Sequence, residues 1–289
     1  MIDRSMLIAT TAKINLGLRI SHKRTDGFHE IETVMQQISL TDYLKLEPCC
    51  QSNIVFQCTD KALETDDNLV LSAARMIGEY NQKLVSGVKI TLYKNVPVQA
   101  GLGGGSADAA ATLKALNSYW SLGLDYDTLH TMAGKLGSDV PFFLKGGTAL
   151  ATGRGERILT LPRLPFFWVI IALPQGVLMS TGAVYKAIPK NSFGSPSISP
   201  LVEAVKIGAK QEIIDWLSTG STNTLENAVL PGFKLIKAFK GRLIQRGLNP
   251  VLSGSGPALF VLADSYQMAC STARIVEEEN GQAYLCWSL

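Results

Sequence analysis

The sequence predicts an α+β protein with two domains. Its 289 residues are more than one hydrophobic core usually organises, and a hydrophobic content of 46% is ample for buried cores. From residue 166 to residue 287 the expected elements follow the order β-α-β-β-α-β, which is typical of a ferredoxin-like unit. We place the boundary near 155–165 and divide the chain into residues 1–160 and 161–289.

The first half is predicted to open with a strand, because apolar residues alternate with polar ones from Ala12 to Ile20. In this pattern Lys13 and Asn15 share one face. The elements expected next are a turn at 25–27, strands near 30–40, 43–48 and 53–58, a helix over about 68–80, a strand over 88–93, helices from Ser106 to about 120 and from about 125 to 136, and a strand over 148–151.

The second half supplies the ferredoxin-like pattern. Its expected elements are a strand over 166–173, a short helix after Ser180, helices between 200 and 230, a helix over 232–246 that Gly247 ends, strands over 249–252 and 258–262, a helix from Ser265 to about 279, and a strand over 283–287. Residues 189–200 are rich in proline and serine and are predicted to form a surface loop.

Composition argues against several functional classes. The net charge of +3 comes from 27 basic and 24 acidic residues without a basic run, so nucleic-acid binding has little electrostatic support. The most apolar segment, 166–173, is too short to span a bilayer, and we expect a cytoplasmic protein without a membrane partner. The five cysteines have no C-x-x-C spacing and are interpreted as reduced structural thiols: Cys49, Cys50, Cys58, Cys270 and Cys286.

The most informative segment runs from Pro97 to Ser106, where glycines lead directly into a predicted helix. Glycine lets the backbone approach a ligand closely, and a helix start offers unpaired N–H groups and a positive dipole end, so the segment predicts a phosphate site. There is no G-x-x-x-x-G-K-[ST] motif, and Pro97 separates the glycines from the preceding strand, unlike a Rossmann loop. An ordinary strand-to-helix turn without a ligand remains the alternative.

Three further positions could take part in chemistry. Asp139 lies in a turn flanked by apolar residues, where a carboxylate can act as a proton acceptor or simply cap the next turn. Lys13 could meet a phosphate or tune a neighbouring acid, although a single lysine is commonly solvated. Residues 253–257, Ser-Gly-Ser-Gly-Pro, fit either a tight hairpin or a backbone packed close to a ligand.

Five segments occur together in the order and spacing of one family: Ala12–Leu16, Asp26–His29, Gly101–Ser106, Gly137–Phe142 and Ser253–Gly256. Over its full length the chain resembles the GHMP kinases, named for galactose, homoserine, mevalonate and phosphomevalonate. The resemblance implies a ribosomal S5 domain 2-like N-terminal domain and a ferredoxin-like C-terminal domain. Within the family, the chain is similar to the subgroup that uses ATP and Mg²⁺ to phosphorylate the 2-hydroxyl of 4-CDP-2-C-methyl-D-erythritol in non-mevalonate isoprenoid synthesis.

The resemblance also assigns expected roles to individual residues. Asp139 would accept the proton of the substrate hydroxyl, and Lys13 would keep that acid ionised and orient the alcohol. ATP would be bound by Pro97, Gly101, Leu102, Gly103, Gly104, Gly105, Ser106, Asn68 and Lys94, with Ser106 also a candidate ligand of magnesium. The substrate would be bound by Asn15, Phe28, His29, Thr181, Tyr185, Gly254 and Ser255.

The chain departs from the subgroup at two positions in or beside these segments. Phe28 stands where a tyrosine is expected, so one polar contact is lost while a face for stacking on cytosine is kept. Ala107 replaces a second serine after the glycines. Two alternatives stay open: a GHMP kinase for homoserine, mevalonate or a sugar, and an inactive relative that only binds nucleotide. Retention of both Lys13 and Asp139 argues against the inactive relative.

Overall fold

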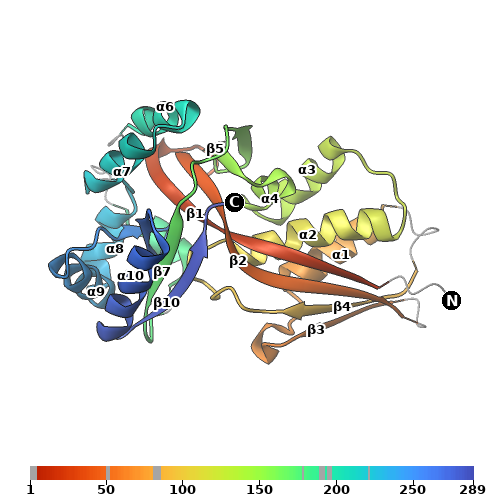
Figure 1. Ribbon diagram of the computed structural model, residues 1–289. Coiled ribbons are helices and arrows are strands. Elements are labelled where there is room, and N and C mark those ends of the chain that lie inside the picture. The colour runs from red at the N-terminus through yellow and green to blue at the C-terminus, as the bar shows by residue number, and fades with distance from the viewer. Residues whose placement is uncertain are drawn as a thin grey trace. The chain divides into compact units, whose positions relative to one another are not determined.

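The computed structural model describes residues 5–49, 53–80, 86–177, 179–188, 193, 197–220 and 222–289 (Figure 1). These form two compact units of interleaved segments. The first unit holds the described residues within Met1–Ala12, Thr41–Val98 and Gly103–Lys145, and the second unit those within Lys13–Leu40, Gln99–Leu102 and Gly146–Leu289. The division at about residue 160 stays a prediction. Cys50 and most of the expected loop 189–200 lie outside the described residues.

Strands β1 (Met6–Lys23) and β2 (His29–Pro48) pair with each other, and each contributes residues to both units. The expected break between residues 40 and 43 was wrong, because β2 is continuous. Asp42 is typical of turns, but here its carboxylate is buried and accepts hydrogen bonds from the backbone N–H groups of Asn95 and Val96.

The first unit combines strands with a group of helices. Residues 43–48 of β2 pair antiparallel with β4 (Val88–Tyr93), which pairs parallel with β3 (Ile54–Cys58). A short 3₁₀ helix (Lys61–Leu63) precedes α1 (Leu69–Gly78), and α2 (Gly104–Tyr119), α3 (Tyr126–Leu136) and α4 (Val140–Lys145) follow. Asn68 and Asp125, near which the sequence predicts these helices to begin, are the N-caps of α1 and α3. Helices α1 and α2 pack side by side (Figure 1).

The second unit contains the predicted ferredoxin-like sheet. Its strand order is β10 (Gly281–Trp287), β7 (Trp168–Pro174), β9 (Leu259–Ala263) and β8 (Val251–Leu252), all antiparallel. Residues 31–36 of β2 pair with β5 (Thr148–Gly153), which pairs with β6 (Arg157–Thr160). The helices are α5 (Thr181–Lys186), α6 (Ser199–Ile207), α7 (Lys210–Ser218), α8 (Glu226–Gly232), α9 (Lys234–Gln245) and α10 (Tyr266–Glu278).

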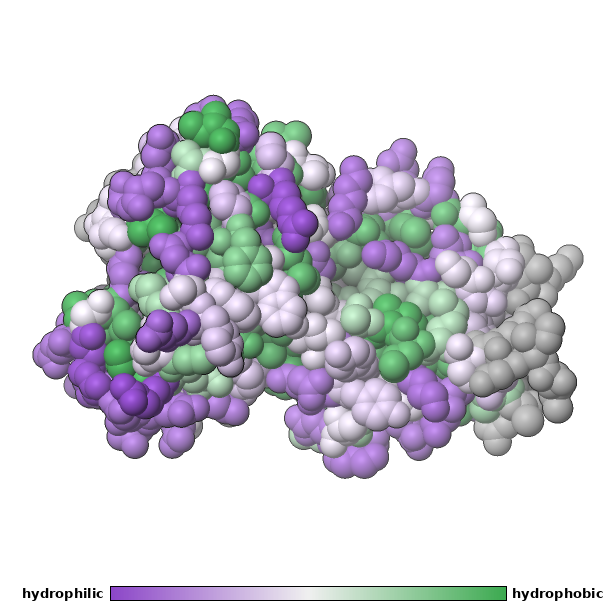
Figure 2. Space-filling view, viewed as in Figure 1, coloured by the Kyte–Doolittle hydropathy of each residue, from purple (hydrophilic) through white to green (hydrophobic). Residues whose placement is uncertain are grey.

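The core of the second unit lies between the ferredoxin-like sheet and its helices. Helices α9 and α10 pack against β7, and buried side chains such as Phe239, Leu243 and Val276 join Ile170 and Leu259 in one hydrophobic cluster. The outer surface of these two helices is mostly hydrophilic (Figure 2).

Basic side chains on that outer surface are balanced by acidic ones. Arg246, the C-cap residue of α9, pairs with Glu278 at 2.5 Å and with Glu279 at 2.8 Å. These ion pairs offset the positive charge of Arg246, and the absence of a nucleic-acid partner stays a prediction. Within the described ranges, no helix combines the length and the apolar character that crossing a bilayer requires.

Candidate active site

Lys13 is the centre of a buried polar cluster in the second unit. Its side chain is 3% exposed, and its Nζ donates to Oδ1 of Asn15 at 2.6 Å and to the carbonyl of Gly101 at 3.1 Å. The backbone N–H of Lys13 donates to the carbonyl of Leu102 at 2.9 Å. A buried ammonium is tolerated only with such acceptors. The structure thus brings together four predicted site residues from β1 and the glycine-rich segment.

The turn at 253–257 packs against the same cluster. It joins β8 to β9, and the hydroxyl of Ser253 donates to the carbonyl of Gly101 at 3.1 Å. Gly254 has a φ of +55°, and an added Cβ there would lie 3.1 Å from Oδ1 of Asn15 and 3.4 Å from Nζ of Lys13. The segment is therefore both the expected hairpin and a place of close backbone approach.

Asn223 fixes this turn and was missed by the sequence analysis. Its buried Nδ2 donates to the carbonyls of Leu252 at 2.9 Å and Gly254 at 2.8 Å, while its Oδ1 accepts from the N–H of Leu225. All three polar groups of the amide are engaged, so the path of the turn around Gly254 is set by a side chain from a distant part of the chain. In a sequence, an asparagine before a helix indicates only a helix cap, so nothing predicted that Asn223 would bind the turn around Gly254.

Four of the predicted substrate-binding residues lie in two neighbouring pairs. The His29 ring lies 5.5 Å from that of Tyr185, and the hydroxyls of Thr181 and Ser255 are 3.0 Å apart. Burial, and then the nearby Lys23, lower the pKa of His29, so the neutral ring is favoured. Phe28 is 51% exposed, with the guanidinium of Arg154 4.8 Å from its ring centre.

Helix α2 begins two residues earlier than expected, at Gly104. Gly103 is its N-cap with a φ of +70°, a conformation that glycine adopts without strain. A Cβ added at Gly104 would lie 2.8 Å from Nζ of Lys94, so the backbone at the start of α2 packs directly against the end of this lysine side chain. Gly105 is exposed and Ser106 half-buried, and the N–H groups of this first turn have no helical carbonyl to bind.

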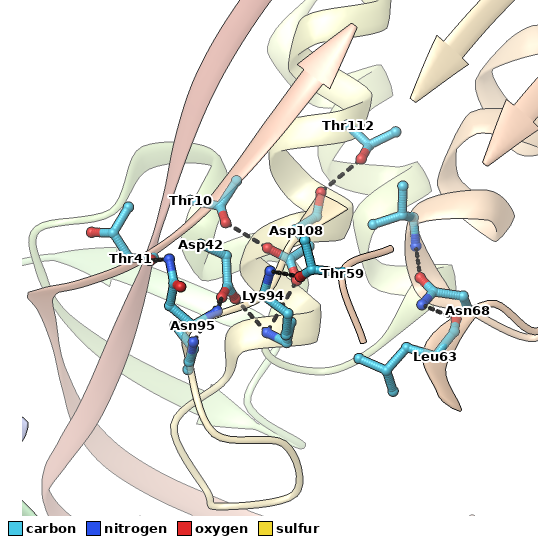
Figure 3. Close-up of polar contacts among 12 residues, drawn as sticks. Thr10, Thr41, Asp42, Thr59, Leu63, Asn68, Lys94, Asn95, Asp108 and Thr112 are labelled. Carbon is cyan, nitrogen blue, oxygen red and sulfur yellow. Dashed lines mark hydrogen bonds and ion pairs between the residues drawn. The ribbon is translucent and has the colours of Figure 1, made fainter. Parts of the chain in front are cut away.

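Asn68 lies close to this helix start but uses its side chain locally. Its Oδ1 accepts from the N–H of Val70 at 2.9 Å, and its Nδ2 donates to the carbonyl of Leu63 at 2.9 Å (Figure 3). A Cβ added at Gly105 would lie 3.7 Å from the Leu69 side chain, so the starts of α1 and α2 are neighbours. A contact from Asn68 to a nucleotide stays a prediction.

Lys94 forms ion pairs with two buried carboxylates beneath the start of α2 (Figure 3). Its Nζ pairs with Asp42 and lies 3.4 Å from Oδ2 of Asp108, while Oδ1 of Asp108 accepts from the hydroxyl of Thr10 at 2.5 Å. Burial raises the pKa of Asp108 to about 6, with Asp42 adding to the rise and Lys94 and Thr10 opposing it. The lysine expected to bind ATP thus has a structural function, and its contact with ATP stays a prediction.

Asp139 lies in the turn between α3 and α4 in the first unit and is half-buried. The six-residue helix α4 after it was not predicted. Its apolar side chains, including Phe142 and Phe143, are buried, which makes this turn a partly desolvated place for a carboxylate. Lys13 belongs to the second unit. Their joint action stays a prediction.

No group of three or more histidine, cysteine, aspartate or glutamate side chains that could hold a metal occurs in the described segments. Mg²⁺ in kinases is commonly held by one or two protein oxygens together with phosphates of the nucleotide, and its binding to this chain stays a prediction. Among the described thiols, burial raises the pKa of Cys286 to about 12, so this thiol has the low reactivity of a structural cysteine.

Comparison with known proteins adds sequence similarity to this geometry. Residues 68–147 match the GHMP kinases N terminal domain. A protein of Listeria welshimeri serovar 6b named 4-diphosphocytidyl-2-C-methyl-D-erythritol kinase is 40% identical over 265 residues, which are 91% of this chain and 89% of that protein. A protein of the same name from Bacillus subtilis is 39% identical over 254 residues, 87% of this chain and 86% of that protein.

Solved structures agree with these sequence similarities. A crystal structure of 4-(cytidine 5'-diphospho)-2C-methyl-D-erythritol kinase has a TM-score of 0.82 and 35% identity, and the match covers 98% of this chain and 99% of that chain. A homoserine kinase from Cytophaga hutchinsonii has a TM-score of 0.73 at 20% identity, covering 100% of this chain and 96% of that one, which shows a shared fold. The predicted fold class is confirmed.

Proposed function

The chain belongs to the family of 4-diphosphocytidyl-2-C-methyl-D-erythritol kinases, which are GHMP kinases, and we propose that it uses ATP to phosphorylate the 2-hydroxyl of 4-CDP-2-C-methyl-D-erythritol. The products are the 2-phosphate and ADP. The observation that carries the substrate is 40% identity, over 91% of this chain, to a protein of that name. Similarity of this extent favours a common substrate over the shared fold alone, which also accommodates homoserine kinase.

The proposed transfer uses Asp139 and Lys13. Asp139 accepts the proton of the 2-hydroxyl as its oxygen attacks the terminal phosphorus of ATP. Lys13 orients the alcohol and keeps the carboxylate ionised. The support for Lys13 is its anchoring: a long, flexible side chain is held by Asn15 and Gly101, so little entropy remains to be lost when the substrate binds. Phosphoryl transfer requires mainly positioning and charge neutralisation.

The proposed ATP site is the glycine-rich segment, with residues 1–160 as the ATP-binding domain. The N–H groups at the start of α2 and the dipole of this 16-residue helix suit a triphosphate. Magnesium bound with ATP neutralises phosphate charge, and Ser106 in the first turn is the proposed protein ligand. The replacement of serine by Ala107 costs little, because backbone N–H groups do most of the binding.

The proposed cytidine site is formed by the aromatic side chains of the second unit. His29 and Tyr185 offer ring faces for stacking, and the exposed ring of Phe28 adds another. The lowered pKa of His29 favours a neutral imidazole, which has both a donor and an acceptor for the edge of a base. Asn15, Thr181, Gly254 and Ser255 are proposed to contact the rest of the substrate.

The experiment that tests the substrate measures ADP release with a panel of alcohols. We expect release with 4-CDP-2-C-methyl-D-erythritol, and ³¹P NMR of the product should show a new monophosphate ester on the carbon-2 oxygen. Homoserine, mevalonate and galactose should give only the background rate. Thermal shift with CMP gives an independent reading, because a ligand that binds the native state raises its melting temperature.

The alternatives predict different results in the same panel. Phosphorylation of homoserine, mevalonate or galactose alone would assign the chain to another GHMP activity. Binding of ATP without turnover of any alcohol would make the chain an inactive relative.

A further inference from the structure

Thr33 is hydrogen-bonded to Asn15 of the Lys13 cluster, and the resemblance to GHMP kinases assigns it no function. It lies on β2 and is 0% exposed, so it cannot itself touch a dissolved substrate. Its Oγ1 accepts from Nδ2 of Asn15 at 2.8 Å, and its hydroxyl donates to the carbonyl oxygen of Gly17 at 2.6 Å. Together with the Lys13–Asn15 bond, these contacts form a continuous chain of hydrogen bonds through the interior of the second unit.

The direction of every bond in this chain is determined by chemistry. A carbonyl oxygen can only accept, so Gly17 takes the one hydrogen of the Thr33 hydroxyl. Toward Asn15 the hydroxyl can then only accept, and it must face the NH₂ group of the amide. The other end of the amide, Oδ1, is thereby turned toward Nζ of Lys13, which can only donate while it is charged. The opposite orientation of the amide would set two donors against each other at both ends.

The amide also has little space to adapt. Its Oδ1 lies where a Cβ on Gly254 would be only 3.1 Å away, so the turn at 253–257 closes this side of the cluster. Both Asn15 and Thr33 are buried, which excludes water as an easy replacement for a lost partner. Loss of the Thr33 hydroxyl would therefore change the orientation of the Asn15 amide and with it the position of the Lys13 ammonium group.

We propose that Thr33 is a positioning residue for the reaction, acting through Asn15 on the ammonium group of Lys13. This inference rests on the proposed function, in which Lys13 takes part in phosphoryl transfer. Thr33 contributes no atom to the chemistry; it selects the one orientation of the Asn15 amide that gives the lysine an oxygen acceptor, and so sets where the ammonium points. Displacement of a reacting group by about 1 Å can cost about 100-fold in rate.

The test compares Thr33→Val with Thr33→Ser. Valine keeps the shape and removes the hydroxyl, whereas serine keeps the hydroxyl. We expect Thr33→Val to lower kcat with the cytidine substrate by about 10- to 100-fold while the KM for ATP changes less than about twofold. Thr33→Ser should restore most of kcat. The Asn15 side-chain amide signals in a ¹⁵N NMR spectrum should shift in the valine variant and return in the serine variant.

Thr148 provides a matched control on the paired strand β5. It is also buried, and its hydroxyl donates to Oε1 of Gln36 at 2.6 Å and accepts from the N–H of Leu164. Thr148→Val therefore removes a comparable buried hydroxyl from the same unit, without touching the Lys13 cluster. We expect its loss of melting temperature to be similar to that of Thr33→Val, with kcat within about twofold of the wild type.

Lys13→Met separates failure of this inference from failure of the proposed function. If Lys13→Met is inactive and Thr33→Val has wild-type kcat, the positioning role of Thr33 is wrong and the role of Lys13 stands. If Lys13→Met keeps full activity, the proposed use of Lys13 is itself wrong, whatever Thr33 does. Equal losses of kcat in Thr33→Val and Thr148→Val would also overturn the inference, because the loss would then follow stability alone.

Discussion

Ser253 donates its hydroxyl to the carbonyl oxygen of Gly101 at 3.1 Å, and this bond joins two segments that are 152 residues apart in sequence. The same carbonyl accepts from Nζ of Lys13. One backbone oxygen therefore ties the first glycine of the glycine-rich segment both to the β8–β9 turn and to the lysine on β1. The positions of all three depend on how closely the backbone at Gly101 can approach its neighbours.

Gly101→Ala is expected to disrupt the hydrogen bonds that Lys13 and Ser253 donate to the carbonyl of this residue. The φ of Gly101 is +77°, and an added Cβ would overlap the carbonyl oxygen of Ser253 and lie 3.0 Å from the N of Gly256. Backbone atoms cannot move aside as a flexible side chain can, so we expect a loss of about 3 kcal/mol or more in the free energy of unfolding, together with loss of kinase activity. Denaturant unfolding and ADP release measure the two effects.

Gly208→Ala is the control for the conformational part of that cost. Gly208 ends α6 with a φ of +67°, but an added Cβ would meet no atom within 4 Å. We expect a loss of only about 1 kcal/mol and unchanged kinetics. If the two alanine variants lost equal stability, the close approach at Gly101 would not be the cause.

Asp139→Asn tests the proposed proton acceptor. The amide keeps the size of the side chain but cannot accept the proton, so we expect kcat to fall by about 10²- to 10⁴-fold. The affinity for ATP, measured by titration calorimetry, should stay within about twofold. Asp127→Asn, in the first turn of α3, is the matched control in the same unit and should have normal kcat. Normal turnover in Asp139→Asn would remove this residue from the mechanism.

The sequence predicted those parts of the molecule whose causes are local. The observed limits of β4 are those predicted, and three helices begin within one residue of the predicted starts at Asn68, Asp125 and Ser265, because alternation and helix-start signals involve only residues near in sequence. Helix α4 and strand β6 were missed. They have six and four residues, which is too short for a periodic pattern, and β6 is defined only by its pairing with β5.

The parts that could not be predicted depend on residues far apart in the chain. The resemblance to GHMP kinases assigned Lys94 to ATP, whereas its ion-pair partner Asp42 lies 52 residues earlier and is of a residue type common in turns. Asp108 looks like an ordinary residue of a helix, and only the fold buries it. Asn223 and Thr33 likewise gain their partners through tertiary contacts, so a single sequence gives no signal for them.

Tyr185→Leu tests the cytidine site separately from the phosphate site. Stacking on a base contributes about 1–3 kcal/mol, so we expect the KM for the cytidine substrate to rise about 10-fold or more while the KM for ATP is unchanged. Tyr185→Phe should keep most of the affinity, because its ring is retained beside His29. Tyr80→Leu, an exposed tyrosine after α1, should leave both constants unchanged. A parallel rise in both KM values would contradict a site specific for the base.

Asp108→Asn is expected to change how stability depends on pH. The carboxyl has a pKa of about 6 in the folded protein, against 3.8 as its ordinary value. Between these values the native state holds a proton that the unfolded state has released, so stability falls as pH rises from about 4 to about 6 and is level above that. At about 1.4 kcal/mol for each pH unit, this carboxyl accounts for up to about 3 kcal/mol of the fall.

The measurement is the free energy of unfolding of the wild type and Asp108→Asn between pH 4 and pH 7. Asparagine cannot titrate, yet its oxygen can still accept from Thr10, and the pairing of Lys94 with Asp42 is kept. The variant should therefore gain stability relative to the wild type as pH rises through this range and keep a constant difference above it. Asp66→Asn, whose side chain is 92% exposed, should follow the wild-type curve. Parallel curves for wild type and Asp108→Asn would mean that the buried carboxyl is ionised throughout, with Lys94 outweighing its burial.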